Sequence, residues 1–351
     1  MNEVRRRTAI LGAPGYIGQH FARLLHDHPA FEDPILVGSH RMVGRRLEDV
    51  WALEEAPPAP LARTQFQSLT PRALAALGVS VAFSALPSGV AGTYESSLAQ
   101  RGVAVFTNAA DHRPDPGVPL LLPEVNPGEL ARLRRRPRGT APIVANPNCT
   151  ATGLALALAP VWGLLRPREV HVSTYQALSG AGLPALVEKS TGNTVVPFIP
   201  GEEEKVGRET TRLLGSVGTP RTTARFLVHA ARVPVRDGHL EAVTVVARHR
   251  PTERQLRAAW RSFDPLSGDG LRTAPHPPVV LADGPDRPQP VRDLWAGAPA
   301  PARGMAAVVG RIRWEPPFLR LFVLSHNAVR GGAGGSVLNA ELALKKGFVT
   351  P

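Results

Sequence analysis

Cys149, the one cysteine in the sequence, is the first candidate for covalent chemistry. It follows Asn146-Pro147-Asn148 and precedes the apolar run 150–161 (TATGLALALAPV). Proline is disfavoured inside a helix and asparagine is a preferred N-cap residue, so the pattern predicts a helix that begins at or near the cysteine. The amides and the dipole of a helix N-terminus lower the pKa of a thiol and can bind an oxyanion. The pattern therefore favours a nucleophile that attacks a carbonyl group over an inert buried thiol.

A glycine-rich turn between the apolar stretch 8–11 and the helix-like stretch 19–28 offers a second chemistry, the binding of a pyrophosphate. Glycines in such a strand–turn–helix let the backbone approach a phosphate, and the first amides of the helix donate to it. A tight turn without a ligand shows the same spacing, so the turn needs support from other features. The predicted cofactor residues of this turn are Gly12, Gly15, Tyr16, Ile17 and Gly18.

The end of a second apolar stretch, 34–37, indicates which dinucleotide is bound. It leads into Gly38-Ser39-His40-Arg41 and carries no Asp or Glu at its tip. The hydroxyl of Ser39 and the guanidinium of Arg41 can hold a ribose 2′-phosphate, which a carboxylate at this position would reject. We therefore predict NADP rather than NAD as the cofactor.

The elements that must position these residues alternate between strands and helices. Strand-like stretches at 79–84 and 103–107 follow the first two, and Ser84 and Pro87 at the end of the third complete the predicted cofactor residues of this region. This alternation predicts a Rossmann-like, doubly wound α/β domain over residues 1–146.

Residues 147–326 are predicted to form a second, α+β domain. The segments 170–177, 224–232 and 241–248 have strand-like composition. The proline-rich region 285–301, which contains Trp295, is predicted to be a surface excursion.

Composition and charge exclude several classes of function. One cysteine excludes an intramolecular disulfide framework, and the absence of an N-terminal apolar segment predicts a soluble, cytoplasmic protein. The formal net charge is +12, but the one dense basic run, 132–138, has no interleaved aromatic residues. We expect no nucleic-acid or membrane partner and no metal site.

Several longer motifs, in the same order, resemble aspartate-semialdehyde dehydrogenase of the archaeal and fungal type. The resemblance extends from residue 8 to about residue 346. The motifs are 109–127, 146–150 (NPNCT), 172–177 (VSTYQA) with 179–182 (SGAG), 197–205 (PFIPGEEEK), 232–239 (RVPVRDGH) and 325–334 (SHNAVRGGAG).

The resemblance implies the NADPH-dependent reduction of L-aspartyl 4-phosphate to L-aspartate 4-semialdehyde with release of phosphate, a step in lysine, threonine and methionine biosynthesis. It implies that Cys149 forms a thioester, that His239 is the general acid and base, and that Gln176 orients the acyl group.

It further implies that Arg232 binds the substrate α-carboxylate, that Glu202 binds its α-ammonium, and that Arg113, Asn148 and Lys205 hold phosphate. Ser179, Gly180, Gly182 and Asn327 would bind the cofactor, with Asn327 near the nicotinamide. The family also implies a homodimer or homotetramer built on the sheet of the second domain, and a C-terminal segment, 327–351, that completes the first domain.

Two residues depart from the family pattern and leave alternatives open. Pro14 removes a hydroxyl and an amide donor from the glycine turn, and Asp111 adds a negative charge two residues before Arg113. Asp111 would either repel phosphate or orient Arg113. The alternatives are a malonyl-CoA or other acyl-CoA reductase that uses the same thioester chemistry, and a catalytically silent interaction protein on this scaffold.

Overall fold

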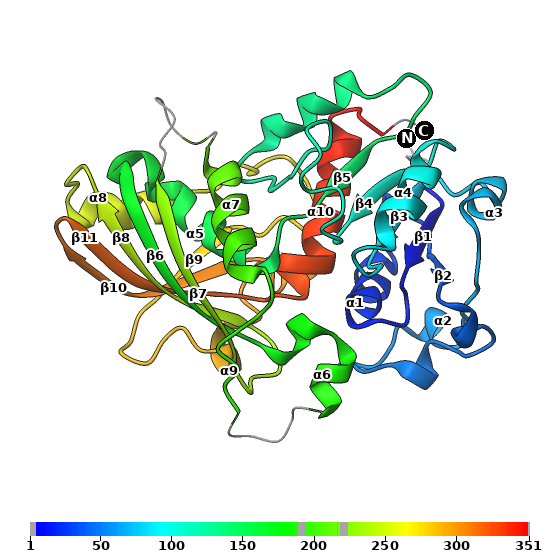
Figure 1. Ribbon diagram of the computed structural model, residues 1–351, viewed down its shortest axis with the longest axis horizontal. Helices are drawn as coiled ribbons and strands as arrows, with labels where there is room; N and C mark the ends of the chain where they lie inside the picture. The colour runs from blue at the N-terminus through cyan, green and yellow to red at the C-terminus, as the bar shows by residue number, and fades with distance from the viewer. Residues whose placement is uncertain (1–4, 189–193, 216, 218–223, 350–351) are drawn as a thin grey trace. The chain divides into compact units, whose positions relative to one another are not determined.

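The chain forms two compact units in the computed structural model, which describes residues 5–188, 194–215, 217 and 224–349 (Figure 1). The first unit comprises Met1–Leu121, Gly128–Asn146 and Gly332–Pro351. The second comprises Leu122–Pro127 and Pro147–Gly331.

The first unit is built on a five-stranded parallel sheet in the order β2-β1-β3-β4-β5. Its central strands are short apolar runs that are buried on both faces, as is usual for parallel sheets. The strand order changes direction at β1, because β2 lies on one side of it and β3 on the other. Folds of this type bind ligands at such a switch point. The strands are β1 (Thr8–Leu11), β2 (Ile35–Val37), β3 (Val81–Ser84), β4 (Ala104–Thr107) and β5 (Ile143–Ala145).

Helices from both ends of the chain cover this sheet. The C-terminal helix α10 packs against α1 and β4, and Glu341 of α10 forms a buried ion pair with His28 at 2.8 Å. The helices are α1 (Tyr16–Leu25), α2 (Ala59–Ala62), α3 (Pro71–Ala76), α4 (Ala91–Ala99) and α10 (Gly334–Lys345), with 3₁₀ turns at His40–Met42, Glu48–Val50 and Pro127–Arg135.

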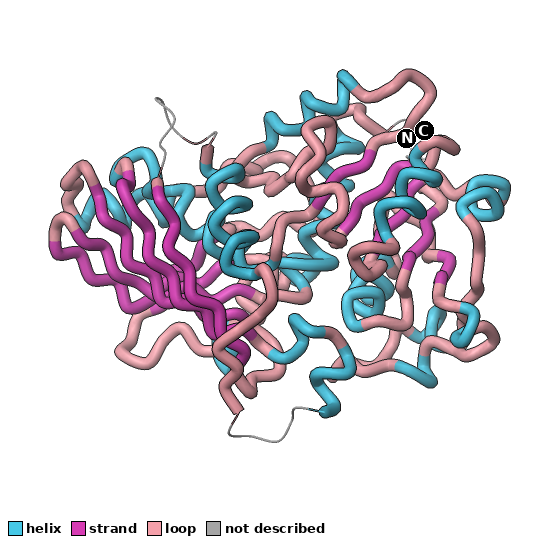
Figure 2. The backbone as a smooth tube through the Cα atoms, in the orientation of Figure 1, coloured by secondary structure: helices cyan, strands magenta, loops and turns pink. Residues whose placement is uncertain are grey.

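The second unit is built on a six-stranded mixed sheet in the order β7-β6-β8-β11-β10-β9. Figure 2 shows strands in magenta. The central pairs β6–β8, β8–β11 and β10–β11 are antiparallel, and the outer pairs β6–β7 and β9–β10 are parallel. The strands are β6 (Pro167–Gln176), β7 (Arg225–Arg232), β8 (His239–Ala247), β9 (Val279–Ala282), β10 (Ala307–Glu315) and β11 (Phe318–Ser325).

Helix α5 is the core helix of this unit. It is apolar around its whole circumference, and it is accordingly buried against the sheet and against α7 and α8. The helices are α5 (Cys149–Leu165), α6 (Leu183–Glu188), α7 (Glu202–Leu214), α8 (Glu253–Ser262) and α9 (Pro290–Asp293), with 3₁₀ turns at Leu178–Ala181 and Ala300–Ala302 and a π-helical turn at Val329–Ala333. No helix in the described part of the chain is long and apolar enough to cross a membrane.

The predicted fold class is confirmed, with shifts at the ends of elements. The helix expected at 19–28 spans Tyr16–Leu25, because Gly15 supplies the extended backbone of the N-cap and Asp27 adopts a left-handed φ of 56° beyond its end. The helix within the C-terminal segment 327–351 spans Gly334–Lys345.

The compact units differ from the predicted domains at two short segments, 122–127 and 327–331, which both group with the second unit. Glu124 and Arg330 explain why these segments stay together: they form a fully buried bidentate ion pair at 2.8 and 2.7 Å. Removing either partner would leave a buried charge uncompensated.

Candidate active site

Cys149 is the first residue of α5, as the sequence predicted, and Asn148 caps the helix. Asn148 Oδ1 accepts hydrogen bonds from the amides of Thr150 and Ala151 at 2.9 and 3.1 Å. These two amides are therefore occupied by the cap and do not serve an oxyanion as the sequence suggested. A β-carbon on Gly331 would lie 2.5 Å from Cys149 Cβ, so the backbone of Gly331 covers the cysteine at a distance that only glycine allows.

His239 faces the sulfur. Its Nε2 lies 3.3 Å from Cys149 Sγ, and its Nδ1 accepts a hydrogen bond from the amide of Ala177 at 3.1 Å. Burial, followed by the positive charges of Arg232 and His326, lowers the pKa of His239 to about 3. The imidazole is therefore neutral at pH 7, and because Nδ1 is an acceptor the single ring proton is on Nε2.

Glu202, at the start of α7, accepts hydrogen bonds from several polar side chains near Cys149. Its Oε1 accepts hydrogen bonds from Gln176 Nε2 at 3.0 Å and from Asn148 Nδ2 at 2.9 Å, and the Thr150 hydroxyl donates to the same oxygen at 3.4 Å. Gln176 lies at the end of β6 and is almost fully buried. Three sequence-predicted residues, Glu202, Gln176 and Asn148, are thus joined in one network.

Arg232 lies at the end of β7, in register with Gln176 on β6. Its Nη1 donates to the carbonyl oxygen of Ala177 at 2.8 Å. Burial lowers the pKa of Arg232, and the negative charges of Cys149 and Glu202 oppose this effect; a guanidinium nevertheless stays protonated at neutral pH. A β-carbon on Gly180 would lie 2.6 Å from Arg232 Nη1 and 3.1 Å from His239 Cε1, so Gly180 lets the arginine approach the histidine.

Asn327 connects two turns near His239. Its Nδ2 donates to Ser179 Oγ at 2.8 Å, and its Oδ1 accepts from the amide of Gly238 at 2.8 Å. Gly182 has a left-handed φ of 84° directly after the Leu178–Ala181 turn. The predicted cofactor residues Ser179 and Asn327 therefore contact each other within the second unit.

The region 285–301 was predicted to be a surface excursion. This is wrong for Leu294 and Trp295, which pack near Gly238 and against His326. Leu294 is buried, and its Cδ1 would lie 2.8 Å from a β-carbon on Gly238. The ring of Trp295 packs edge-on against His326, with 4.6 Å between ring centroids.

Two of the predicted phosphate residues are not joined to this cluster. Lys205 is partly exposed and lies over Gly201, whose β-carbon would be 3.8 Å from Lys205 Cε. Within the described parts of the chain, no hydrogen bond or ion pair links Lys205 to Cys149 or His239. Arg113 belongs to the first unit, where its Nη2 donates to the carbonyl of Asn108 at 2.7 Å.

The glycine turn of the first unit has the geometry that a dinucleotide phosphate requires. Gly12 has a left-handed φ of 77°, and a β-carbon there would lie 2.7 Å from the carbonyl oxygen of Ala85. A β-carbon on Gly18 would lie 2.3 Å from Gly12 O, so both positions demand glycine. No side chain caps α1, and its first turn contains no acidic residue. These residues fit a bound pyrophosphate.

The tip of β2 is open to solvent. Ser39 and Arg41 are exposed and flank the start of the His40–Met42 turn. Pro14 packs beside this tip, because a β-carbon on Gly38 would lie 3.0 Å from Pro14 Cγ. The carbonyl of Pro14, the residue that departs from the family pattern, accepts a hydrogen bond from Gln19 Nε2 at 2.9 Å. This bond attaches the turn at Pro14 to helix α1.

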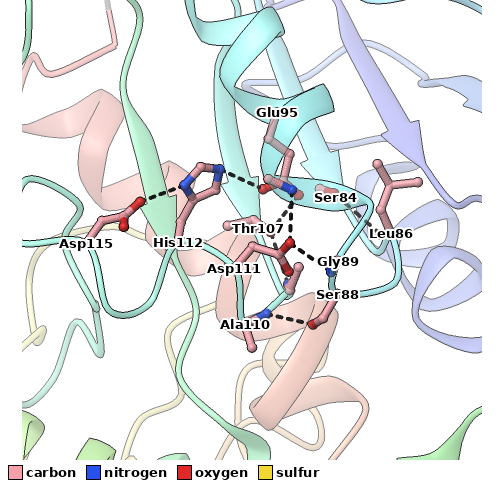
Figure 3. A network of polar contacts seen from close by, with 12 residues as sticks. Ser84, Leu86, Ser88, Gly89, Glu95, Thr107, Ala110, Asp111, His112 and Asp115 are labelled. Atoms are coloured by element: carbon pink, nitrogen blue, oxygen red, sulfur yellow. Dashed lines mark hydrogen bonds and ion pairs between the residues drawn. The ribbon is translucent and has the colours of Figure 1, made fainter.

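Asp111 neither pairs with Arg113 nor projects as an isolated charge. Its Oδ1 accepts hydrogen bonds from the amides of Gly89 and Gly92 at 2.8 and 3.2 Å (Figure 3). Burial would raise the pKa of Asp111, but these amides and the Ser88 hydroxyl outweigh burial and lower it. Asp111 therefore joins its loop to the one that follows β3.

Comparison with known proteins places the chain in a family. Two family models match it: one described as semialdehyde dehydrogenase, NAD binding domain, over residues 7–133, and one described as semialdehyde dehydrogenase, dimerisation domain, over residues 158–330. An aspartate-semialdehyde dehydrogenase of Archaeoglobus fulgidus is 39% identical, across 99% of this chain and 100% of the relative. The chain belongs to the aspartate-semialdehyde dehydrogenase family.

Two other comparisons bear on function. The crystal structure of aspartate semialdehyde dehydrogenase with NADP from Candida albicans has a TM-score of 0.83 and 30% identity, and the match covers 99% of this chain and 100% of that one. A malonyl CoA reductase (NADP) of Metallosphaera sedula is 34% identical, across 98% of this chain and 99% of the relative.

The aspartate-semialdehyde dehydrogenase motifs did not draw attention to two carboxyl groups at this centre. Glu209 Oε2 accepts from the amide of Asn148 at 2.7 Å, and Glu209 lies two turns after Glu202 on the same face of α7. Glu241 is fully buried on β8, two residues after His239. The strand period of two, which places residues i and i+2 on one face, was the available signal for Glu241. The spacing of seven between Glu202 and Glu209 was the signal for the other.

Proposed function

We propose that this chain reduces L-aspartyl 4-phosphate to L-aspartate 4-semialdehyde with NADPH and releases phosphate. The observation that carries the proposal is the contact between Cys149 Sγ and His239 Nε2, 3.3 Å at the start of α5. Membership of the aspartate-semialdehyde dehydrogenase family supports the choice of substrate.

The thiolate of Cys149 attacks the acyl carbon, the bond from that carbon to the phosphate oxygen breaks, and phosphate leaves a thioester behind. NADPH, when bound, supplies the hydride that reduces this thioester. Release of the aldehyde then breaks the carbon–sulfur bond and returns the thiolate.

His239 donates a hydrogen bond at successive steps of this reaction. With Nδ1 engaged by the Ala177 amide, its Nε2–H points at the sulfur and stabilises the thiolate. The same proton is placed to reach the oxyanion that forms on the carbon attached to that sulfur. The low pKa of His239, about 3, keeps the ring neutral, so that it gives this proton as a hydrogen-bond donor instead of holding a permanent charge.

Substrate recognition falls to Arg232, Glu202 and Gln176. Arg232 binds the α-carboxylate with the guanidinium hydrogens that the Ala177 carbonyl leaves over. Glu202 binds the α-ammonium through Oε2, which accepts no hydrogen bond from the described residues, whereas Oε1 has three donors. Gln176 orients the acyl group as a neutral donor that does not protonate the thiolate.

Arg113, Lys205 and Asn148 hold the phosphate group. The cap and Glu202 already engage Asn148, which leaves one of its two Nδ2 hydrogens for phosphate. Lys205 supplies a flexible positive charge near the start of α7, and Arg113 supplies a planar guanidinium.

NADP is held by the glycine turn and the tip of β2 in the first domain, with Ser39 and Arg41 on the 2′-phosphate. The family match described as an NAD binding domain and the NADP-bound Candida albicans structure support this assignment. The cofactor residues are Gly12, Gly15, Tyr16, Ile17, Gly18, Ser39, Arg41, Ser84, Pro87, Ser179, Gly180, Gly182 and Asn327.

The catalytic domain, 147–326, also assembles the protein. The match described as a dimerisation domain supports a homodimer, or a tetramer of dimers, formed through its sheet. For a reaction between small molecules we expect a cytoplasmic protein, with small molecules as its ligands and neither nucleic acid nor membrane as a partner.

A malonyl-CoA reductase is the second candidate, because the Metallosphaera sedula relative is similar over nearly the whole chain. Its substrate also has a carboxylate for Arg232 and forms a thioester on Cys149. Malonyl-CoA has no ammonium group that could bind Glu202. The carboxyl group of Glu202 at this place therefore favours the amino-acid substrate.

Turnover of the purified protein tests the proposal. NADP reduction by aspartate semialdehyde is followed with and without phosphate, beside NADPH oxidation by malonyl-CoA and succinyl-CoA. Phosphate-dependent NADP reduction is expected. Turnover with an acyl-CoA alone would replace this function with the second candidate, and no turnover with any substrate would contradict both.

A further inference from the structure

The loops that leave the carboxyl ends of β3 and β4 are tied together by polar contacts that none of the proposed roles uses (Figure 3). The first loop begins at Ser84 and continues to the start of α4, and it contains the proposed cofactor residue Pro87. The second runs from Thr107 to about residue 115 and carries Arg113. In an open parallel sheet, loops at this edge form the ligand site, so their relative position matters for binding.

Glu95, on α4, is the buried centre of these contacts. It is 0% exposed, and its Oε1 accepts a hydrogen bond from Thr107 Oγ1 at 2.7 Å. Thr107 Oγ1 in turn accepts from the amide of Ala109 at 3.0 Å, which turns the chain at the end of β4. Burial raises the pKa of Glu95, and hydrogen bonds from Ser84 and Thr107 and the charge of His112 lower it in part. One carboxyl group therefore contacts the ends of both strands.

His112 connects Glu95 to the second loop. Its Nε2 lies 3.5 Å from Glu95 Oε2, and its Nδ1 lies 2.9 Å from Asp115 Oδ2. The ring is buried, whereas the Asp115 side chain is half-exposed. The residue after His112 is Arg113, so fixing the imidazole between two carboxyl groups also fixes the backbone from which the arginine extends.

A second set of contacts joins the two loops at their outer ends. Ser88 Oγ accepts from the amide of Ala110 at 3.0 Å, and Asp111 Oδ1 accepts from the amides of Gly89 and Gly92. These contacts join the two loops, but none of them involves the side chain of His112, the residue before Arg113. The contact from Glu95 to His112 is buried and reaches the residue directly before Arg113.

We propose that Glu95 is a positioning residue that, through Thr107 and His112, holds the loop carrying Arg113 in the conformation that binds the phosphate of the substrate. This inference rests on the proposed function only in the identity of the ligand of Arg113. The ordering of the loop is a property of the chain itself.

Glu95→Gln is the first test, because glutamine keeps an oxygen for the Thr107 hydroxyl and replaces the negative charge toward His112 with an amide. Thr93→Ala is the matched control, since Thr93 is exposed on the same helix. Hydrogen–deuterium exchange without substrate should be faster in residues 108–115 of Glu95→Gln than in wild type. The KM for phosphate in aspartate semialdehyde oxidation should rise by about 10-fold, with kcat and the Kd for NADP changed by less than about threefold.

Unchanged exchange in residues 108–115 would overturn the proposal. Faster exchange with an unchanged KM for phosphate would overturn the connection to Arg113, and an equal loss of NADP affinity would show that Glu95 supports the cofactor loop instead. If Glu95→Gln does not fold, His112→Gln is measured in the same way and decides by the same outcomes. A wild-type protein that does not oxidise aspartate semialdehyde would contradict the proposed function, but the exchange experiment would still decide whether Glu95 orders the loop.

Discussion

Two buried carboxyl groups near Cys149 and His239 lie in contrasting surroundings. Glu202, at the start of α7, receives three hydrogen bonds on one oxygen. Glu241, on β8, has both oxygens buried with no hydrogen-bond partner among the described residues. Burial, followed by the negative charge of Glu202, raises the pKa of Glu241 well above its ordinary value. Burial and the neighbouring Glu202 therefore favour the neutral, protonated form of Glu241.

The difference shows that two carboxyl groups at similar depth have very different access to hydrogen-bond donors. Both side chains belong to almost fully buried residues, with 8% exposure for Glu202 and 0% for Glu241. The surroundings of Glu202 are two helix starts rich in N–H and O–H groups. Those of Glu241 are the sheet and the first turns of α5, where Gly153 and Ser325 are its neighbours. The polar side suits a charged substrate, and burial without donors disfavours charge on the sheet side.

The largest effect should come from the sulfur that both regions adjoin. Cys149→Ser is expected to lower kcat by roughly 10³-fold or more, because a neutral Nε2–H donor cannot remove the proton of a serine hydroxyl. The Kd for NADP, measured by fluorescence titration, should stay within about threefold of wild type. Retained turnover would contradict a thioester mechanism.

His239 should produce the next largest effect, on stability. Its folded pKa of about 3 lies below its ordinary value of 6.5, so protonation favours the unfolded chain. Its contribution is fully present above about pH 6.5 and is lost as the pH falls toward 3, by on the order of 4 kcal/mol. Urea unfolding across this range should be less pH-dependent in His239→Gln than in wild type. His229→Gln, an exposed histidine on β7, is the control, and the same slope in both variants would contradict the low pKa.

Glu202→Gln should lower kcat/KM for aspartate semialdehyde by about 10²-fold, because it removes the charge that meets the ammonium. Glutamine keeps an oxygen for Gln176 and Asn148, so it separates this loss from collapse of the network better than alanine does. Glu204→Gln, exposed in the same helical turn, is the control. An unchanged kcat/KM with aspartate semialdehyde would mean that Glu202 does not bind the ammonium.

The elements of this protein could be predicted where local sequence decides them. The strand at Thr8–Leu11 and the helix start at Cys149 follow from an apolar run, a proline and an N-cap asparagine. The grouping of Leu122–Pro127 with the second unit could not, because it depends on the ion pair between Glu124 and Arg330, which are far apart in the chain.

Several residues that lie together around Cys149 could be predicted from the sequence, but their protonation states could not. Motif positions identified His239 and Glu202 as candidates, yet the neutral ring of His239 depends on its burial and on Arg232 and His326. Asp111 likewise could repel phosphate or orient Arg113 on sequence grounds, and the structure shows that it binds the amides of Gly89 and Gly92 instead. Contacts between residues distant in sequence decide these properties.

The smallest effect on activity is expected at Glu241. Since the wild-type group is already neutral, Glu241→Gln should change kcat/KM by less than about threefold.

Its effect should appear in stability instead, with the opposite sign to that of His239. The raised pKa means that the contribution of Glu241 is fully present below its ordinary pKa of 4.5 and is lost as the pH rises toward the folded value. Glutamine does not ionise, so thermal unfolding of the variant and the wild type should agree near pH 4.5 and diverge in favour of the variant at alkaline pH. A fall in kcat/KM as large as that of Glu202→Gln would show that Glu241 works as a carboxylate, and the contrast between the two groups would then be wrong.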